Sequence, residues 1–190
     1  MNNPFVARLL SHSRSWASCT RIALARATGA EIGPGCSLRA GCDVQLGVAR
    51  AREGRVVLGV GCTLERGVIL HPYGGTVILG RSVFLGPGTV VYGHGGVTIG
   101  DDSLISMHCR ILSSNHAMPP PDTLIRSQPD ILLPTKIGRD VWLGAGVTVL
   151  GGVTVGDGCI VGAGAVVTKN LSPGCIAMGI PAQIAGMRDD

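Results

Sequence analysis

One histidine, His116, stands where an otherwise regular repeat gives way to polar residues and three prolines, SSNHAMPPP at residues 113–121. An imidazole with a pKa near about 6.5 can take a proton from a hydroxyl at neutral pH and return it to a leaving group. Acyl transfer from a thioester to an alcohol needs such a base, because an alcohol is a poor nucleophile. Taken alone, a single loop histidine is more typical of a solvated surface residue, so its role depends on the chain around it.

The other histidines are typical of surface or turn residues. His12 falls in a helical pattern, His71 and His94 fall in insertions, and His108 falls at a turn. His94 and His108 remain candidates to contact an acceptor. A shared zinc site of His71, His94 and His108 is not favoured, because the three do not occupy one slot of the repeat.

The repeat around these residues has a period of six. Its aliphatic positions are Ile32, Leu38, Val44; Leu58, Leu64, Leu70; Leu79, Leu85, Val91; Ile99, Ile105, Ile111; and Ile137, Leu143, Val149, Val155, Val161, Val167. Extra residues fall only after every third position: eight before Leu58, three before Leu79, two before Ile99 and twenty before Ile137. Three hexapeptides per coil explain this pattern. It predicts an all-β solenoid of six coils whose insertions all leave from one corner of a three-sided prism.

A second inward slot follows each aliphatic position by four residues and holds small or β-branched residues. Its members are Cys36, Cys42, Cys62, Val68, Val83, Thr89, Ser103, Cys109, Val141, Val147, Val153, Cys159 and Ala165. Five of the seven cysteines fall in this slot, and the sequence has no CxxC pair. We interpret them as small core residues rather than metal or redox ligands.

Composition agrees with a solenoid in a chain long enough for one domain. Glycine is frequent at 30 residues and aromatic residues make up only 3%, which indicates many tight turns and a core of stacked aliphatic layers. The net charge of +4 comes without the dense basic runs of a nucleic-acid binder. The sequence shows no secretory signal or spanning apolar stretch, so we expect a cytoplasmic protein.

Three segments are expected. Residues 1–28 form an N-terminal helical segment with apolar residues from Phe5 to Leu24 and four arginines. This segment is predicted to cap the open end of the solenoid, or alternatively to dock on an anionic membrane surface. Residues 29–170 form the solenoid with an active-site loop at 112–136, and residues 171–190 form a C-terminal capping tail.

The segment IGRDVWLGAGVTVLGGVTVGDGCIVGAGAVVTKNLSPGCIAMGIPAQI, residues 137–184, resembles the hexapeptide-repeat acyltransferases. The chain is most similar to the maltose, galactoside and polysaccharide O-acetyltransferase branch, over about residues 77–184. This resemblance implies a left-handed parallel β-helix, acetyl-CoA as the acyl donor, and a homotrimer with active sites between subunits. No metal is expected. It also implies that His116 is the catalytic base, with Asn115 orienting its ring or lining the site.

Two GAG triplets, at 144–146 and 162–164, are eighteen residues apart and therefore stack in the predicted prism. Tight corners tolerate small residues, which is one explanation of the triplets. The other is a shallow track for the pantetheine arm of CoA. The resemblance favours the track and implies that Gly144, Ala145 and Ala163 bind the cofactor.

Three more residues are expected at the cofactor. Thr168 and Lys169 resemble the family segment that meets the nucleotide end of CoA, where a lysine can pair with phosphate. The C-terminal tail lacks the basic residues that relatives often carry, and Arg188 could substitute for them. Trp142 occupies an outward slot and is expected to form an apolar wall beside the thioester or the acceptor.

We therefore predict an acetyl-CoA-dependent O-acetyltransferase that acts on a sugar hydroxyl, in surface polysaccharide or glycan biosynthesis, in the cytoplasm or at the inner face of the membrane. The alternatives are an N-acetyltransferase of an amino sugar or xenobiotic and a non-catalytic hexapeptide scaffold. The segment FLGPG, residues 84–88, lacks the asparagine of the maltose-type enzymes, which argues against a simple free disaccharide as the acceptor.

Overall fold

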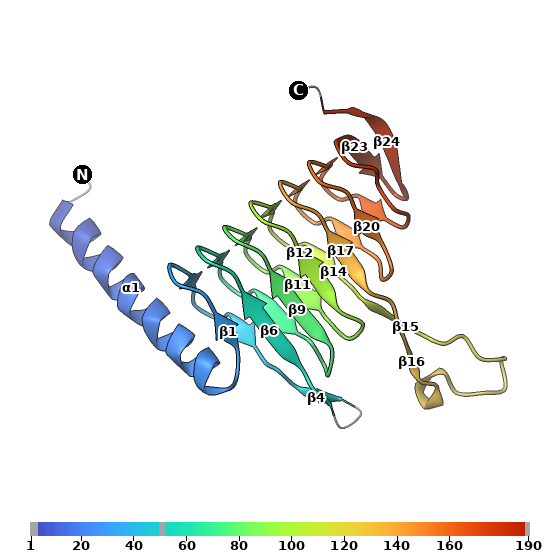
Figure 1. The fold of residues 1–190 in the computed structure, drawn as a ribbon, viewed down its shortest axis with the longest axis horizontal. Helices are drawn as coiled ribbons and strands as arrows, with labels where there is room; N and C mark the ends of the chain where they lie inside the picture. Colours follow the sequence, from blue (N-terminus) through green and yellow to red (C-terminus); the bar gives the residue numbers. More distant parts are fainter. Residues whose placement is uncertain (1–3, 50–51, 189–190) are drawn as a thin grey trace.

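The chain folds into a three-sided parallel β-helix with a helix at one end and a β-hairpin at the other (Figure 1). The structure is a computed structural model that describes residues 4–49 and 52–188. Each coil contributes one short strand to each of three parallel sheets. The prediction of a left-handed solenoid with an N-terminal helical segment is confirmed.

The three sheets form the faces of the prism. The first sheet consists of β1 (Glu31–Ile32), β6 (Arg55–Leu58), β9 (Thr76–Leu79), β12 (Val97–Ile99), β17 (Thr135–Ile137) and β20 (Thr154–Val155). The second consists of β2 (Ser37–Leu38), β7 (Thr63–Leu64), β10 (Phe84–Leu85), β13 (Leu104–Ile105), β18 (Trp142–Leu143), β21 (Ile160–Val161), β23 (Cys175–Gly179) and β24 (Ala182–Met187). The third consists of β3 (Asp43–Val44), β8 (Ile69–His71), β11 (Val90–Tyr92), β14 (Arg110–Ile111), β19 (Thr148–Val149) and β22 (Val166–Val167).

All predicted insertions leave the prism between the third sheet and the first, at an edge that we call the insertion corner. They include the hairpin of β4 (Val48–Ala49) and β5 (Arg52–Glu53), and the longer hairpin of β15 (Ser114–His116) and β16 (Asp130–Leu132), which also carries the short 3-10 helix η1 (Ile125–Ser127). The edge between the second sheet and the third is more regular. We call it the glycine–alanine corner, and it holds residues 39–41, 65–67, 86–88, 106–108, 144–146 and 162–164.

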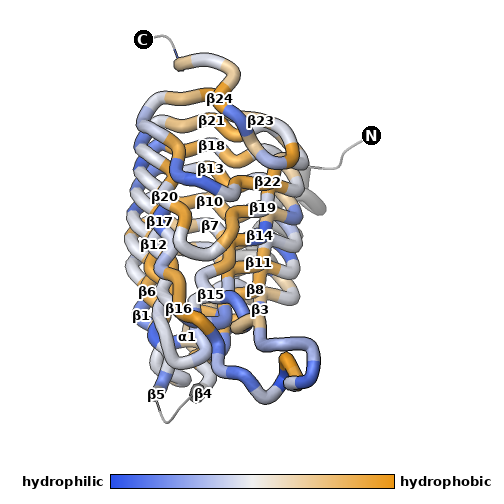
Figure 2. Tube along the Cα trace, turned by 90° about the vertical axis from the view of Figure 1, so that its right-hand side faces the viewer, coloured by the Kyte–Doolittle hydropathy of each residue, from blue (hydrophilic) through white to orange (hydrophobic). Residues whose placement is uncertain are grey.

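Strand register confirms the six-residue repeat. Ile99 pairs with Ile137, and Ile137 pairs with Val155, although thirty-eight residues separate the first pair and eighteen the second. Apolar residues therefore form columns along the prism (Figure 2). The aliphatic positions are buried, except that Val44 in the first coil is only partly buried, because a terminal coil has a neighbour on one side only.

The small residues of the second slot face inward as predicted, and their polar atoms are paired. The Cys62 thiol donates to the Gly80 carbonyl at 3.0 Å and the Cys109 thiol to the Gly144 carbonyl at 3.2 Å. The Ser103 hydroxyl donates in the same way to the Gly138 carbonyl at 2.9 Å. Each of these groups satisfies a carbonyl of the next coil, which explains why cysteine and serine are tolerated in a dry core.

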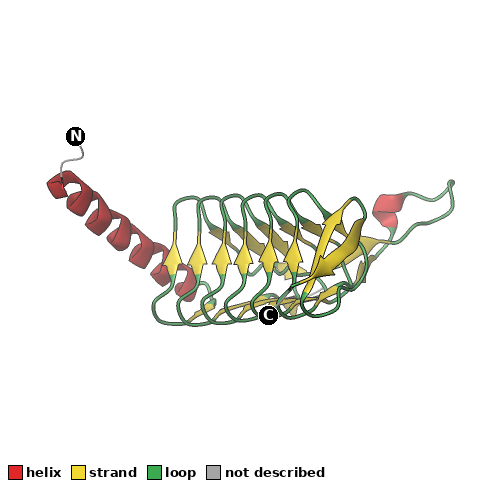
Figure 3. Cartoon of the chain, turned by 90° about the horizontal axis from the view of Figure 1, so that it is seen from above, coloured by secondary structure: helices red, strands yellow, loops and turns green. Residues whose placement is uncertain are grey.

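The helix α1 (Pro4–Ala27) covers the open edge of the first coil. The Ser18 hydroxyl accepts from the Leu38 backbone N–H at 2.9 Å, and the Arg21 guanidinium donates to the Leu38 carbonyl at 2.8 Å. These contacts occupy groups that an edge strand would otherwise offer to another chain. The helix continues beyond the prism (Figure 3). Side chains of residues 4–15, including Phe5, lie outside the part of the chain that is described.

The C-terminal tail continues the second sheet instead of leaving it. β23 pairs in parallel with β21, and β24 then pairs antiparallel with β23. The hairpin ends the sheet at the far end of the prism. Among the residues that the structure describes, no helix is both long and apolar enough to cross a membrane.

Candidate active site

His116 lies on a two-stranded hairpin that leaves the prism at the insertion corner. β15 pairs antiparallel with β16 and places His116 opposite Asp130. The base of the hairpin is anchored by Ser113, which is buried: its hydroxyl donates to the Tyr92 carbonyl at 2.7 Å, and its carbonyl accepts from Leu133 N–H at 2.8 Å. The excursion ends at Pro134, because Thr135 already belongs to β17.

The ring of His116 is oriented by a carboxylate. Its Nδ1 atom lies 3.0 Å from Oδ1 of Asp130, and 68% of the His116 side chain is exposed. A carboxylate can only accept, so this contact makes Nδ1 the protonated nitrogen and leaves Nε2 as the basic one. The sequence interpretation missed Asp130, although two short runs flanking a proline-rich turn, SSNH and DILL, are compatible with a hairpin that pairs them.

Asn115 lies beside His116 but on the other face of the strand. Successive strand residues point in opposite directions, and Asn115 is opposite Ile131 rather than Asp130. The predicted orienting contact to His116 Nδ1 is therefore made by Asp130. A role of Asn115 in lining the site stays a prediction.

The two GAG triplets form one strip of backbone at the glycine–alanine corner. Gly164 N–H donates to the Ala145 carbonyl at 2.8 Å, which stacks the triplets directly. A Cβ added at Gly146 or Gly164 would have no neighbour within 4 Å, so the strip is open on its outer side. Gly144 differs, because it is buried and its added Cβ would lie 2.6 Å from Ala163 N. Gly144 therefore lacks a side chain because the next coil packs directly against its backbone.

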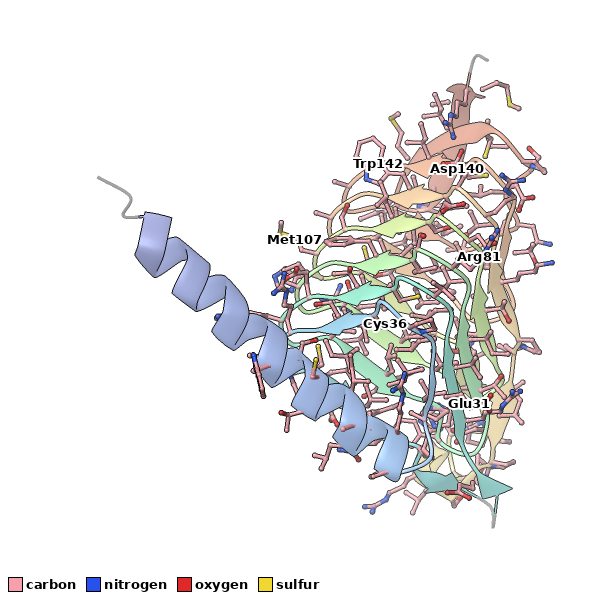
Figure 4. The ribbon with its side chains drawn as sticks, turned by 60° about the vertical axis from the view of Figure 1, so that its left-hand side comes forward. Glu31, Cys36, Arg81, Met107, Asp140 and Trp142 are labelled. Atoms are coloured by element: carbon pink, nitrogen blue, oxygen red, sulfur yellow. The ribbon has the colours of Figure 1, made fainter. Side chains whose placement is uncertain are left out.

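Trp142 projects outward from β18 on the same side of the prism as Met107 (Figure 4). Its Nε1–H donates to the Ser106 hydroxyl at 3.2 Å, and half of the residue, 50%, is exposed. The hydrogen bond holds the ring toward the glycine–alanine corner, where Ser106 begins the turn. Trp142 thus forms an apolar border to the strip of GAG backbone.

Thr168 and Lys169 lie at the insertion corner, in the turn that follows β22. Both are exposed. The His116 hairpin follows β14, where Arg110 pairs with Thr148 of β19, and Thr148 pairs with Val166 of β22. Thr168 and Lys169 therefore lie two coils beyond the start of the hairpin. Arg188 is elsewhere: its guanidinium contacts the Asp140 carboxylate at 2.7 Å, between the first and second sheets. Within one protomer Arg188 is therefore not beside Lys169, and its contact with CoA stays a prediction.

The candidate residues thus fall into two groups on two edges of the prism. Asn115, His116, Thr168 and Lys169 share the insertion corner, whereas Trp142, Gly144, Ala145 and Ala163 border the glycine–alanine corner. The third sheet separates the two edges by about five residues of extended chain, roughly 15 Å at about 3.3 Å per residue. One protomer does not bring its predicted base and its predicted track together.

Three of the remaining histidines, His71, His94 and His108, are divided between the same corners. His71 and His94 lie together at the insertion corner, in contact with Tyr73 and Tyr92. His108 lies at the glycine–alanine corner in a left-handed conformation with φ of 57°. Within one protomer the three do not converge on one point, and the absence of a zinc site stays a prediction.

Known proteins match this chain at the level of its repeats and its fold. Residues 134–169 match the family model "Bacterial transferase hexapeptide (six repeats)", and residues 76–108 match "Hexapeptide repeat of succinyl-transferase". Nodulation protein L of Rhizobium meliloti (strain 1021) is 44% identical over 92 residues, 47% of this chain. The match covers 48% of that protein, so the aligned region spans about half of its length.

Two solved structures extend the comparison. The hexapeptide-repeat acetyltransferase of Vibrio cholerae O1 biovar eltor, complexed with acetyl-CoA, is 28% identical with a TM-score of 0.63 and covers 70% of this chain and 71% of its own. AntD, an N-acyltransferase from Bacillus cereus in complex with dTDP and 3-hydroxybutyryl-CoA, shares the fold at 19% identity, with a TM-score of 0.69 over 84% of this chain and 83% of its own. In its repeats and its fold, the chain is similar to the hexapeptide-repeat acyltransferases.

Proposed function

We propose that the chain is an acetyl-CoA-dependent O-acetyltransferase that acts on a sugar hydroxyl, with His116 as the general base. The observation that carries this proposal is the contact of His116 Nδ1 with Asp130 at 3.0 Å. A solvated surface histidine needs no fixed tautomer, whereas a general base needs one nitrogen held and the other available. The hairpin supplies that arrangement where the repeat is interrupted.

In this mechanism Nε2 of His116 removes the proton from the acceptor hydroxyl. The hydroxyl oxygen then forms a bond to the thioester carbonyl carbon, and the carbon–sulfur bond breaks. The leaving thiolate takes the proton from Nε2, which gives an acetyl ester and free CoA. The Asp130 carboxylate balances the positive charge that the imidazole carries between these steps. Backbone N–H groups of the glycine–alanine corner are candidates to stabilise the oxyanion.

The two groups of candidate residues meet only if two copies of the chain face each other. We propose a homotrimer in which the insertion corner of one subunit faces the glycine–alanine corner of the next. The pantetheine arm would then lie along Ala145 and Ala163 beside Trp142, while Thr168 and Lys169 of the neighbouring copy meet the nucleotide end. The open outer side of Gly146 and Gly164 supports this placement, because a side chain there would fill the track.

The proposed acceptor is a sugar, and a cytoplasmic site of action at the inner face of the membrane would give a lipid-linked glycan access. Nodulation protein L is similar to this chain over 92 residues. A second candidate is N-acetylation of an amino sugar, which the fold shared with AntD favours. Alkali distinguishes the products, because an acetyl ester is hydrolysed in dilute base and an acetamide is not.

Calorimetric titration with acetyl-CoA and CoA is the first test. Micromolar binding to a trimeric sample is expected, and a panel of sugars then identifies the acceptor. The variant His116→Ala should bind CoA as the wild type does and transfer acetyl groups at least 100-fold more slowly. Absence of CoA binding at millimolar concentration, in a sample shown to be trimeric by ultracentrifugation, would contradict the proposal.

A further inference from the structure

Both tyrosines of the chain lie at the insertion corner, next to the base of the His116 hairpin. The chain has only two Tyr, two Trp and two Phe, and the buried core formed by the described residues contains no aromatic ring. Tyr73 stacks on His94 with ring centroids 4.4 Å apart, and it meets Tyr92 edge to face at 5.4 Å. His71 lies against both tyrosines, at 5.3 and 6.1 Å. We refer to these four residues as the aromatic cluster.

Hydrogen bonds fix the polar atoms of His71 and Tyr73 in the cluster. His71 Nε2 lies 2.9 Å from the Asp43 carboxylate, and His71 Nδ1 lies 3.2 Å from the Tyr73 hydroxyl. Because the carboxylate can only accept, Nε2 carries the proton, and in the neutral ring Nδ1 accepts from the Tyr73 hydroxyl. The phenol oxygen of Tyr73 keeps acceptor capacity for another donor. Burial and the neighbouring Tyr92 raise the pKa of the Tyr73 phenol, so it stays protonated at neutral pH.

Packing of the prism does not account for these residues. The equivalent turn one coil after the hairpin is Leu150-Gly151-Gly152, which closes the same corner without any ring. The four members of the cluster are only partly buried, so part of each residue is accessible at the surface. Aromatic rings combined with a few oriented hydrogen-bonding groups are the composition of a small-molecule site. The C–H face of a pyranose packs on such rings while its hydroxyls reach the polar atoms.

The cluster lies within reach of the proposed base. The Ser113 hydroxyl donates to the Tyr92 carbonyl at 2.7 Å and accepts from Gly95 N–H at 3.1 Å, which joins the base of the hairpin to the Tyr92–His94 turn. His116 is three residues beyond Ser113, so the extended strand places it within about 10 Å. One or two sugar rings bridge such a distance.

We propose that the aromatic cluster is the acceptor subsite and that it takes a pyranose ring of a glycan. This inference rests on the proposed acetyl transfer and adds to it the residues that select the substrate class. Tyr73, Tyr92 and His94 provide the surface for the sugar ring. His71 and Asp43 hold the Tyr73 hydroxyl in position for a sugar hydroxyl, and the adjoining ring or exocyclic hydroxyl is presented to His116.

Saturation-transfer NMR on the full chain tests this inference. The probes are methyl β-glucopyranoside, methyl β-galactopyranoside and methyl N-acetyl-β-glucosaminide, each with saturating CoA. Saturation is expected on the ring C–H protons of at least one probe. Tyr73→Asn, whose side chain tolerates the φ of 45° found at Tyr73, should weaken that sugar about tenfold. Tyr92→Leu should act in the same direction.

A control variant makes the result decisive. Trp16→Leu removes an exposed aromatic ring from α1 and should leave sugar binding unchanged. If a Tyr92 variant fails to fold, Tyr73→Asn alone carries the test, since Tyr73 lies in a turn. Equal sugar binding by wild type and Tyr73→Asn, or no pyranoside binding by a protein that binds CoA, would overturn the subsite. Failure to bind CoA would instead remove the proposed function, and the subsite with it.

Discussion

The imidazole of His108 lies over the α-carbon of Gly88, one coil earlier at the glycine–alanine corner. A Cβ added to Gly88 would meet His108 Nδ1 at 2.6 Å. The corresponding positions in the other coils at this corner are glycines, Gly41, Gly67, Gly146 and Gly164, all with positive φ. His108 therefore adopts, at a φ of 57°, a left-handed conformation at a position where the other coils have glycine.

Replacing His108 with glycine should stabilise the protein. A left-handed conformation costs a non-glycine residue about 1–2 kcal/mol, and glycine returns about 0.5–1 kcal/mol of that as extra entropy in the unfolded chain. We expect a net gain of roughly 0.5–1 kcal/mol in the free energy of unfolding, measured by urea denaturation. Gly88→Ala should destabilise the protein, and the double variant should recover part of that loss because the imidazole is gone. Additive effects would show that the two residues do not contact each other.

Asp130→Asn should impair catalysis without impairing cofactor binding. An asparagine can present its N–H to His116 Nδ1, which favours the tautomer with the proton on Nε2 and removes the basic nitrogen. We expect the kcat for acetyl transfer to fall by about 100-fold, with the CoA dissociation constant unchanged by calorimetry. The matched control is Asp122→Asn, an exposed carboxylate in the same loop. A KM effect with unchanged kcat would instead place Asp130 in substrate binding.

Ala163→Leu should block the proposed pantetheine track. Ala163 is exposed on the strip of GAG backbone, so a leucine fits without disturbing the core and projects over the track. We expect the CoA dissociation constant to rise at least tenfold and the melting temperature to change little. Ala40→Leu introduces the same side chain at the same corner in the first coil, where Ala40 is also exposed. It should leave CoA binding unchanged, and equal binding by both variants would contradict the track.

The free energy of unfolding should fall at alkaline pH because the folded protein contains buried thiols. Burial raises the pKa of Cys62 and of Cys159 from 9.0 to about 11. Between these values the unfolded chain loses thiol protons that the folded chain keeps, so the free energy of unfolding falls as pH rises from about 9 to 11. Each thiol contributes up to about 1.4 kcal/mol per pH unit. Cys62→Val should reduce this slope in urea titrations, and an identical slope would show that Cys62 is not responsible.

The repeat made the prism predictable, because an aliphatic residue every sixth position leaves one way to bury all of them. The same reasoning could not find Asp130 or the aromatic cluster. Asp130 reaches His116 through the register of a hairpin inside an insertion, where no period constrains the pairing. The cluster combines residues from the insertions of two successive coils, which differ in length, and its His71 contacts Asp43 of the first coil. Contacts between residues of different insertions therefore cannot be predicted from their spacing in the sequence.

Subunit complementation should show whether the site is shared between copies. His116→Ala removes the base from the insertion corner, and Ala163→Leu blocks the track at the glycine–alanine corner. Each homotrimer should have little activity at a CoA concentration that does not saturate the Ala163→Leu variant, because every copy carries the same defect. Co-expression of the two variants in equal amounts should restore about a quarter of the wild-type activity, since one arrangement of copies in four gives an intact site. A mixture that stays inactive, although mass spectrometry shows mixed trimers, would mean that His116 and Ala163 of the same copy form the site.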